Sequence, residues 1–221
     1  MVFPVLTIVV LFIIAMFAAN KKSDRQMKEQ LDQFWEKEQA ANLVRKQSLE
    51  DLHYIRIPED FFAFPYDPEA DPDAAEAMTI LKSLKDEQIV NFTGISNTDL
   101  KLSFGAANLP SLSRFDQNYT LLARALQSLA DYLVRKEQTA DAIRVLEFAV
   151  DTKTDISSTY KLLGDLYIKN GNRDKIDDLI PKAAALNSAL SGAIVRSLED
   201  KKASIITSSS ETSSPTQDTT P

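Results

Sequence analysis

Few side chains in this sequence could carry out acid–base, nucleophilic or metal chemistry. Histidine occurs once, as His53, and cysteine does not occur. A nucleophile–base pair would therefore need His53 to activate a distant serine, and no motif marks which serine that would be. The same counts argue against thiolate metal sites, multi-histidine metal sites and disulfides. We expect no catalytic residue, no metal site and no enzymatic activity.

Carboxylates gather in two short stretches, Glu69–Asp73 and Asp174–Asp178. The first lies in a proline-rich segment and the second lies where a helix is expected to begin. Acidic side chains near a helix N-terminus interact favourably with the helix dipole. Both stretches therefore indicate either solvated charge or acidic groups at the start of a helix. The five glycines form neither GxGxxG nor GxxxxGK[ST], so a phosphate-binding loop and a cofactor are not expected either.

Composition limits the kind of partner. The formal net charge is −7, whereas a nucleic-acid surface needs a basic face, so we expect no nucleic acid partner. The 221 residues allow one globular domain with appendages. The absence of cysteine fits a reducing cytosol and equally the exterior of a cysteine-poor bacterium.

The elements that would position any functional residue lie between Tyr119 and Ser188, where the sequence repeats with a period of about 34 residues. The matching pairs are Leu126 and Tyr160, Leu129 and Leu163, Ala130 and Gly164, Leu133 and Tyr167, Ala142 and Ile176, Leu146 and Ile180, and Ala149 and Ala183. This period is typical of helix–turn–helix solenoids. It predicts one hairpin over 118–136 and 139–152 and a second over 157–170 and 173–187.

These residues resemble the tetratricopeptide repeat. Leu163-Gly164-x-x-Tyr167 is similar to the small-residue core of that family's first helix, and Ala142, Leu146 and Ala149 are similar to the core of its second helix. The resemblance covers about 70 of the 221 residues. The sequence departs from the family where Thr154 and Ser188 replace the closing proline, where Pro181 lies inside the last helix, and where Ile176 replaces an alanine.

The resemblance implies a partner-binding groove lined by the first helices of successive hairpins. The positions that match its lining are Arg124, Gln127, Asp131 and Arg135 in the first repeat, and Ser158, Lys161, Asp165 and Lys169 in the second. Their mixed charges lack the all-basic set that clamps a terminal carboxylate in some relatives. We therefore expect an unknown protein or peptide partner without that specificity. Whether the segment Phe61–Tyr66 covers this surface stays open.

The amino terminus predicts a membrane anchor. Val2–Ala19 contains no charged residue, and about 18 apolar residues is near the minimum for crossing a bilayer. We therefore predict a transmembrane helix over 1–20 that contacts the membrane through residues 2–19. A cleaved signal peptide and a buried helix are the alternatives, although no basic residue precedes the apolar run. Because Lys21, Lys22, Arg25 and Lys28 follow it, the positive-inside rule places the remaining chain in the cytoplasm.

The next segment, 21–51, predicts a polar juxtamembrane helix with one narrow apolar stripe. The stripe consists of Met27, Leu31, Phe34, Trp35 and Leu43, with a gap at Glu38. It could lie on the membrane or a partner, or dock on the chain's own soluble domain.

Segment 52–72 combines prolines with aromatic residues. Pro58, Pro65, Pro68 and Pro72 prevent a continuous helix, and the aromatic residues are Phe61, Phe62, Phe64 and Tyr66. We interpret it as a segment that wraps the first hairpin, the alternative being an exposed adhesive strip.

Two further helices are predicted before the repeats. One begins at Pro72 or Asp73, buries Met78, Leu81, Leu84, Ile89 and Val90, and ends at Gly94. The other runs from Thr98 to Phe104, with Ser96 or Asn97 as its N-cap, and stops at Gly105. After the repeats, Leu190–Lys201 fits a solvating helix that covers the last hairpin.

The predicted fold class is all-α, with an N-terminal transmembrane helix followed by a small tetratricopeptide-like α-solenoid. The predicted parts are a transmembrane helix at 1–20, a juxtamembrane helix at 21–51, a wrapping segment at 52–72, a helical domain at 73–201 and a disordered Ser/Thr-rich tail at 202–221.

The function expected from this organisation is a membrane-anchored, single-pass scaffold for protein–protein interaction at the cytoplasmic membrane face. The alternative is an extracytoplasmic assembly or chaperone accessory protein. The chain also resembles uncharacterised, membrane-anchored proteins of Gram-positive bacteria, a likeness that implies no activity.

Overall fold

A computed structural model of the chain describes the backbone of residues 3–211. Side chains are described from residue 25 to residue 204, and for Met16 and Lys21 before that. Over this range the chain is built from α-helices and short 3-10 helices, without a strand. The all-α part of the predicted fold class is therefore confirmed.

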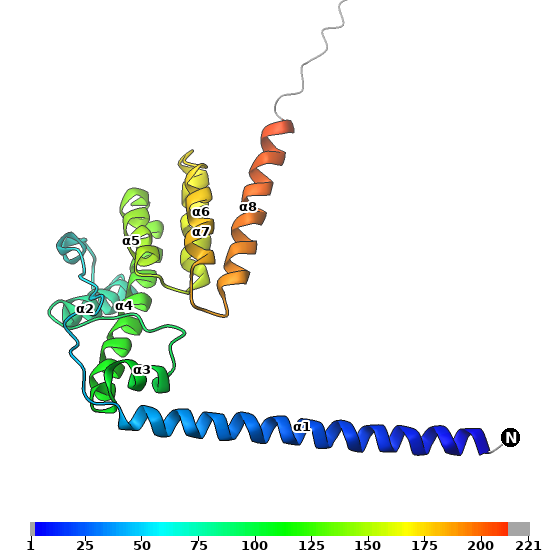
Figure 1. Cartoon of the computed structure of the whole chain (residues 1–221). Helices are drawn as coiled ribbons and strands as arrows, with labels where there is room; N and C mark the ends of the chain where they lie inside the picture. The colour runs from blue at the N-terminus through cyan, green and yellow to red at the C-terminus, as the bar shows by residue number, and fades with distance from the viewer. Residues whose placement is uncertain (1–2, 212–221) are drawn as a thin grey trace, which may run out of the picture. The chain divides into compact units, whose positions relative to one another are not determined.

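The elements are numbered in chain order as in Figure 1. They are α1 (Phe3–Leu43), η1 (Glu59–Ala63), α2 (Pro72–Leu84), α3 (Asn97–Phe104), η2 (Ala106–Asn108), α4 (Leu109–Arg135), α5 (Thr139–Asp151), α6 (Ser157–Lys169), α7 (Lys175–Ala184) and α8 (Ser191–Glu211).

The chain divides into two compact units. One unit combines Met1–Leu49 with Ser96–Pro110, and the other combines Glu50–Ile95 with Ser111–Pro221. We call them the N-terminal unit and the repeat unit, and each is described separately.

In the N-terminal unit, the short helix α3 packs on the carboxyl-terminal part of α1. It begins at Asn97, one residue before the predicted Thr98, and ends at the predicted Phe104. Of the two predicted N-caps the structure has Ser96, whose hydroxyl accepts a hydrogen bond from the Asp99 N–H (3.1 Å). Glu38 of α1 accepts hydrogen bonds from Thr98 (2.7 Å) and from Lys101. The gap in the apolar stripe of α1 is therefore the place where a carboxylate faces α3.

The end of α3 is fixed by close backbone contacts. Gly105 has a φ of +86°, and a Cβ there would lie 2.5 Å from the Arg45 carbonyl oxygen. Asn108, which is 2% exposed, donates to the carbonyl oxygens of Gln47 (2.8 Å) and Phe104 (2.7 Å). These contacts explain why residues 96–110 belong with the N-terminal unit.

The prediction of a transmembrane helix is wrong. No helix formed by the residues that the structure describes has the length and apolar character needed to cross a bilayer. The predicted single-pass membrane localisation is contradicted by the same finding. A membrane contact was predicted for residues 2–19, and almost all of their side chains lie outside the described residues. Residues 1–2 lie outside them altogether.

Helix α1 does not stop where the apolar run stops, and the part of it whose side chains are described is mainly polar. α1 continues for 41 residues as one helix, without a boundary near Asn20 between an anchor and a juxtamembrane segment. Its described side chains are mainly charged or amide groups in water, from Arg25 to Asn42. The exposed apolar exceptions, 49–67% exposed, are Met27, Leu31, Phe34 and Trp35.

In the repeat unit, small side chains occupy the positions where helices touch. Ala130, Ala142 and Ala183 are fully buried, and Ala149 is 1% exposed. A Cβ on the buried Gly164 would lie 3.3 Å from the Lys201 side chain of α8. Figure 1 shows α5, the α6–α7 pair and α8 side by side within this unit. These burial values agree with the predicted close packing of the helices.

The first hairpin turns through a hydrogen-bonded cap at the end of α4. The N–H of Glu137 donates to the Val134 carbonyl oxygen (3.0 Å), and the N–H of Gln138 donates to that of Leu133 (2.9 Å). Glu137 has a φ of +60°, in the left-handed region that such caps require.

The second hairpin repeats this cap one sequence period later. The N–H of Gly171 donates to the Ile168 carbonyl oxygen (3.1 Å), and the N–H of Asn172 donates to that of Tyr167 (2.9 Å). Gly171 has a φ of +75°. The period of the sequence is thus also a period of the backbone hydrogen bonds.

The period extends into α8. Helices α6 and α8 begin at Ser157 and Ser191, which are again one period apart. Before α6, the Thr154 hydroxyl accepts from the Ile156 N–H (3.3 Å). Before α8, the Ser188 hydroxyl accepts in the same way from the Leu190 N–H (3.2 Å). Helix α8 therefore begins one sequence period after α6 and is preceded by the same hydroxyl contact.

The aromatic segment lies on the first hairpin. Phe61 is 2% exposed and meets Phe148 of α5 edge to face, with 5.5 Å between ring centroids. The Tyr132 hydroxyl donates to the Pro65 carbonyl oxygen (2.9 Å), and Arg144 pairs with Asp60. The segment therefore covers the hairpin with buried rings.

Three element boundaries differ from the predicted ones by nine residues or more. Helix α2 ends at Leu84 instead of Gly94, because the N–H of Ile55 pairs with the Ile89 carbonyl oxygen (2.9 Å) and holds that stretch extended. Helix α4 begins at Leu109, nine residues before the predicted Asn118, with Pro110 in its first turn.

Helix α8 continues to Glu211, ten residues past the predicted Lys201, because no glycine or proline interrupts the segment. The remainder of the predicted disordered tail, 212–221, lies outside the described residues.

Candidate binding sites

The predicted groove residues of the first repeat line a hollow between α4 and α2. Arg124, Asp131 and Arg135 face it from α4, and Asp73 and Glu76 face it from α2. Its volume is about 340 Å³. Arg135 and Asp73 form a long ion pair of 3.8 Å. The basic side chains of one wall thus oppose the acidic side chains of the other.

The predicted groove residues of the second repeat lie against α8. Lys161 lines a hollow of about 510 Å³ together with Arg196 and Asp200 of α8. Asp165 forms an ion pair with Lys201 of α8. Ser158 and Lys169 are exposed at the two ends of α6. The structure therefore brings Lys161 and Asp165 to one helix pair and leaves Lys169 apart.

Gln127 connects the two repeats. Its side-chain oxygen accepts from the Thr159 hydroxyl of α6 (2.7 Å), and its amide donates to Asp131 (3.1 Å). The first helices of the two hairpins are therefore joined by a polar contact at the middle of the predicted surface. This surface carries side chains of opposite charge along α4 and α6.

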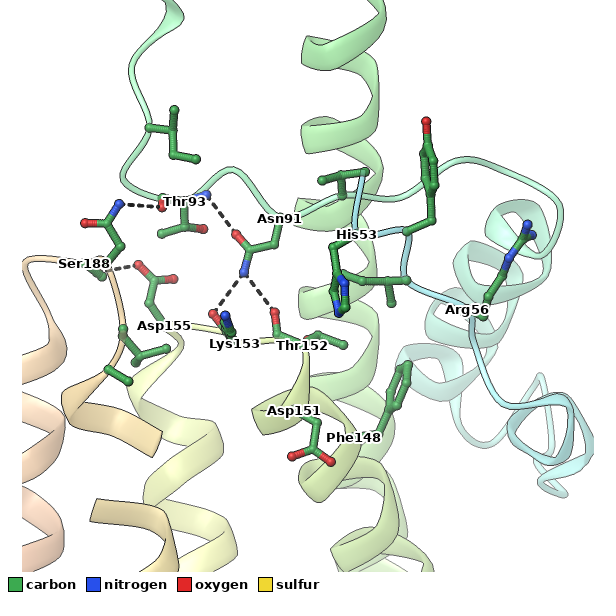
Figure 2. A pocket seen from close by; sticks show the side chains of 17 residues that line it. His53, Arg56, Asn91, Thr93, Phe148, Asp151, Thr152, Lys153, Asp155 and Ser188 are labelled. Atoms are coloured by element: carbon green, nitrogen blue, oxygen red, sulfur yellow. Dashed lines mark hydrogen bonds between the residues drawn. The ribbon is translucent and has the colours of Figure 1, made fainter. Parts of the chain in front are cut away.

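A second candidate site, which sequence reasoning did not predict, lies at the loop ends of the hairpins. It is a hollow of about 500 Å³. Four segments form it, namely 53–56, 90–95, 148–155 and 185–188. Figure 2 shows His53 entering from one side and Asp155 with Ser188 on the other. No local motif marks this site, because its four segments lie far apart in the sequence.

A strap formed by residues 90–95 holds the hollow together. The Asn91 amide donates to the carbonyl oxygens of Thr152 (2.9 Å) and Lys153 (3.0 Å), as the dashed lines of Figure 2 show. The Asn187 amide donates to the Thr93 carbonyl oxygen (3.4 Å). Gly94, with a φ of +77°, lies so close to Asn187 that a Cβ would be 2.0 Å from its carbonyl oxygen. The strap therefore fixes both inter-repeat turns.

The hollow does not bring His53 to the Ser188 hydroxyl. The Ser188 hydroxyl donates to Asp155 (2.7 Å), and the same oxygen accepts from the Leu190 N–H. His53 lies across the hollow from Ser188, on the far side of Asn91 (Figure 2).

Two buried tyrosines lie behind this region. Burial raises the pKa of Tyr119 to about 12, and its hydroxyl lies near Thr152 and Thr154 without a well-formed hydrogen bond to the described residues. Burial also raises the pKa of Tyr160, whose hydroxyl donates to the Thr154 carbonyl oxygen (3.0 Å). Both phenols are therefore neutral at physiological pH and serve the packing of the inter-repeat turn.

No group of three or more His, Cys, Asp or Glu side chains able to hold a metal ion occurs among the described residues. Comparison of the chain with protein-family models, with curated proteins and with solved structures gives no match. Assignment to a repeat family therefore has to be argued from this chain alone.

Proposed function

We propose that the repeat unit is a tetratricopeptide-like protein-binding module whose partner surface lies on α4 and α6. The observation that carries this proposal is the repetition of the cap at Glu137 and Gly171, with the same backbone hydrogen bonds one period apart. The similar residues of the sequence and the hydrogen bonds of the caps repeat with the same period. Successive hairpins of this kind present their first helices to a common partner.

The side chains of the surface support a polypeptide partner. Arg124 and Arg135 in the first hairpin and Lys161 and Lys169 in the second are basic side chains on successive first helices. Acidic side chains lie between them, with Asp131 on α4 and Asp165 on α6. Alternating charges of this kind select a partner by complementary pattern and by association rate more than by buried area.

Charge reversal on one hairpin tests the proposal. The double variant Lys161→Glu/Lys169→Glu of the full chain is compared with the wild type by affinity purification and quantitative mass spectrometry. A matched control, Lys28→Glu/Lys46→Glu, makes the same change of net charge at exposed side chains of the N-terminal unit.

The expected result is a set of proteins retained by the wild type and the control but reduced about tenfold or more with the α6 variant. Equal recovery with all three proteins would refute a partner surface on α6. Circular dichroism checks that the variants remain helical.

A further inference from the structure

The hollow at the hairpin ends has the size and the walls of a small-ligand site. Its volume of about 500 Å³ lies within the range of about 300–1,000 Å³ found for such sites. Val90 and Leu186, 4% and 8% exposed, form apolar wall, and Phe148 adds an aromatic surface. Ile95 also lines the hollow and is 45% exposed, so aliphatic surface is open to solvent there.

The acidic groups of the hollow already have partners. Asp151 forms an ion pair with Lys182 (2.7 Å), and Asp155 accepts a hydrogen bond from Ser188 (2.7 Å). The Asn91 amide satisfies the two backbone carbonyl oxygens that point inward from the α5–α6 turn. The hollow therefore has little capacity left for a cationic ligand.

Its basic groups are free to bind. Lys153, Arg56 and His53 line the hollow, and their side chains make no hydrogen bond or ion pair with the residues that the structure describes. With Asp151 neutralised by Lys182, the two permanent positive charges exceed the single remaining negative charge of Asp155. This balance of charge favours an anion attached to an apolar group over a cation.

The backbone at Lys153 adds an independent observation. The N–H of Lys153 donates to the Val150 carbonyl oxygen (2.9 Å), which closes α5 with the type of cap seen at Glu137 and Gly171. Its φ is +61°, a conformation that favours glycine and disfavours residues that carry a Cβ. Glu137 has the same conformation in the same type of cap, so what distinguishes Lys153 is its position on the wall of the hollow.

From these observations we infer that the hollow bounded by His53, Asn91, Lys153 and Leu186 binds a small aliphatic carboxylate. Lys153 pairs with the carboxylate, and Val90, Ile95 and Leu186 contact the aliphatic part. The carboxylate could belong to a peptide carboxyl terminus or to a free short-chain acid. This site is separate from the partner surface on α4 and α6, so each proposal can fail without the other.

Titration of the full, isotope-labelled chain by NMR tests the inference with four probes. N-acetyl-leucyl-leucine and hexanoate carry the carboxylate, and N-acetyl-leucyl-leucinamide and hexanamide are their neutral counterparts. Shifts of the Asn91, Thr93 and Lys153 amide signals report on the hollow. The inference predicts saturable shifts with a carboxylate probe and at least tenfold weaker binding of its amide.

The variant Lys153→Gly separates the contribution of the Lys153 side chain to binding from the effect of its backbone conformation on stability. Glycine relieves the left-handed strain, so this variant should melt about 1–3 °C higher than the wild type and yet bind the carboxylate at least tenfold more weakly. The matched control is Glu137→Gly, which relieves the same strain at the other cap and should leave binding unchanged.

If N-acetyl-leucyl-leucine binds and hexanoate does not, the site is specific for a peptide carboxyl terminus. If both bind, the site accepts aliphatic carboxylates in general. Equal binding of carboxylates and amides would overturn the inference. So would unchanged affinity in Lys153→Gly, or an absence of shifts in the hollow.

Discussion

The two hairpins of the repeat unit share a backbone and differ in what covers them. Both turn through the same cap, at Glu137 in the first hairpin and at Gly171 in the second. The first is covered by the aromatic segment around Phe61, and the second by α8. The comparison shows that the period of the repeat specifies the path of the chain, whereas the remainder of the sequence specifies the surfaces that stay accessible.

The largest expected effect comes from truncating equivalent core residues. Leu129→Ala and Leu163→Ala each remove a side chain that is 1% exposed or less from the first helix of a hairpin. Each should lower the free energy of unfolding by about 2–5 kcal/mol, because a cavity replaces buried apolar contacts. Urea denaturation measures both, with Leu190→Ala, at a 47% exposed side chain, as the control. A loss for only one of the two would show that the hairpins are not structural equivalents.

Exchanging the cap residues between the two hairpins should change the stability by less than the core truncations do. Gly171→Glu should cost about 1 kcal/mol, because glutamate is strained at a φ of +75°. Glu137→Gly should stabilise the fold by about 0.5 kcal/mol for the opposite reason. Thermal denaturation of both variants tests the shared geometry, and changes of the same sign would contradict it.

The smallest expected effect concerns a contact between the hairpins. Glu147 of α5 accepts hydrogen bonds from Tyr167 of α6 (2.7 Å) and Lys175 of α7 (2.8 Å). Burial opposes the ionisation of Glu147, but these two partners outweigh it and hold its pKa below the ordinary value. The contact therefore stabilises the fold at neutral pH, and this contribution is lost as the pH falls through the lowered pKa.

The variant Glu147→Gln should therefore show a weaker decline of stability between pH 6 and pH 3 than the wild type. The difference should be about 0.5 kcal/mol, since the side chain is 36% exposed and solvent screens the pair. Urea midpoints measured across this range test the prediction. Parallel pH profiles would show that the contact contributes nothing.

The hairpins were predictable from sequence because their information is local and repeated. Small residues at Ala130 and Gly164 and the breaker Asn170-Gly171-Asn172 mark helix contacts and turns within a few residues. The cap of α3 at Ser96 was predictable for the same reason. These patterns depend on residues that are close in the sequence, so they can be recognised without knowing the tertiary contacts.

Other features depend on contacts between distant segments and could not be predicted in this way. Ile89 and Val90 have the pattern of a helix face, but pairing with Ile55 and Phe115 draws them into an extended stretch. The apolar amino terminus has the composition of an anchor, yet α1 runs on through its charged half. The hollow around Lys153 could not be predicted because four distant segments must come together to form it.

The central claim is that the two hairpins present one surface to one partner. Its most direct test is the affinity of a partner, identified as above, for two charge-reversal variants, Arg124→Glu/Arg135→Glu on α4 and Lys161→Glu/Lys169→Glu on α6. We predict that each variant binds this same partner about tenfold more weakly or worse, while Lys28→Glu/Lys46→Glu binds as the wild type does. Loss with the α6 variant and unchanged affinity with the α4 variant would contradict a surface shared by both repeats.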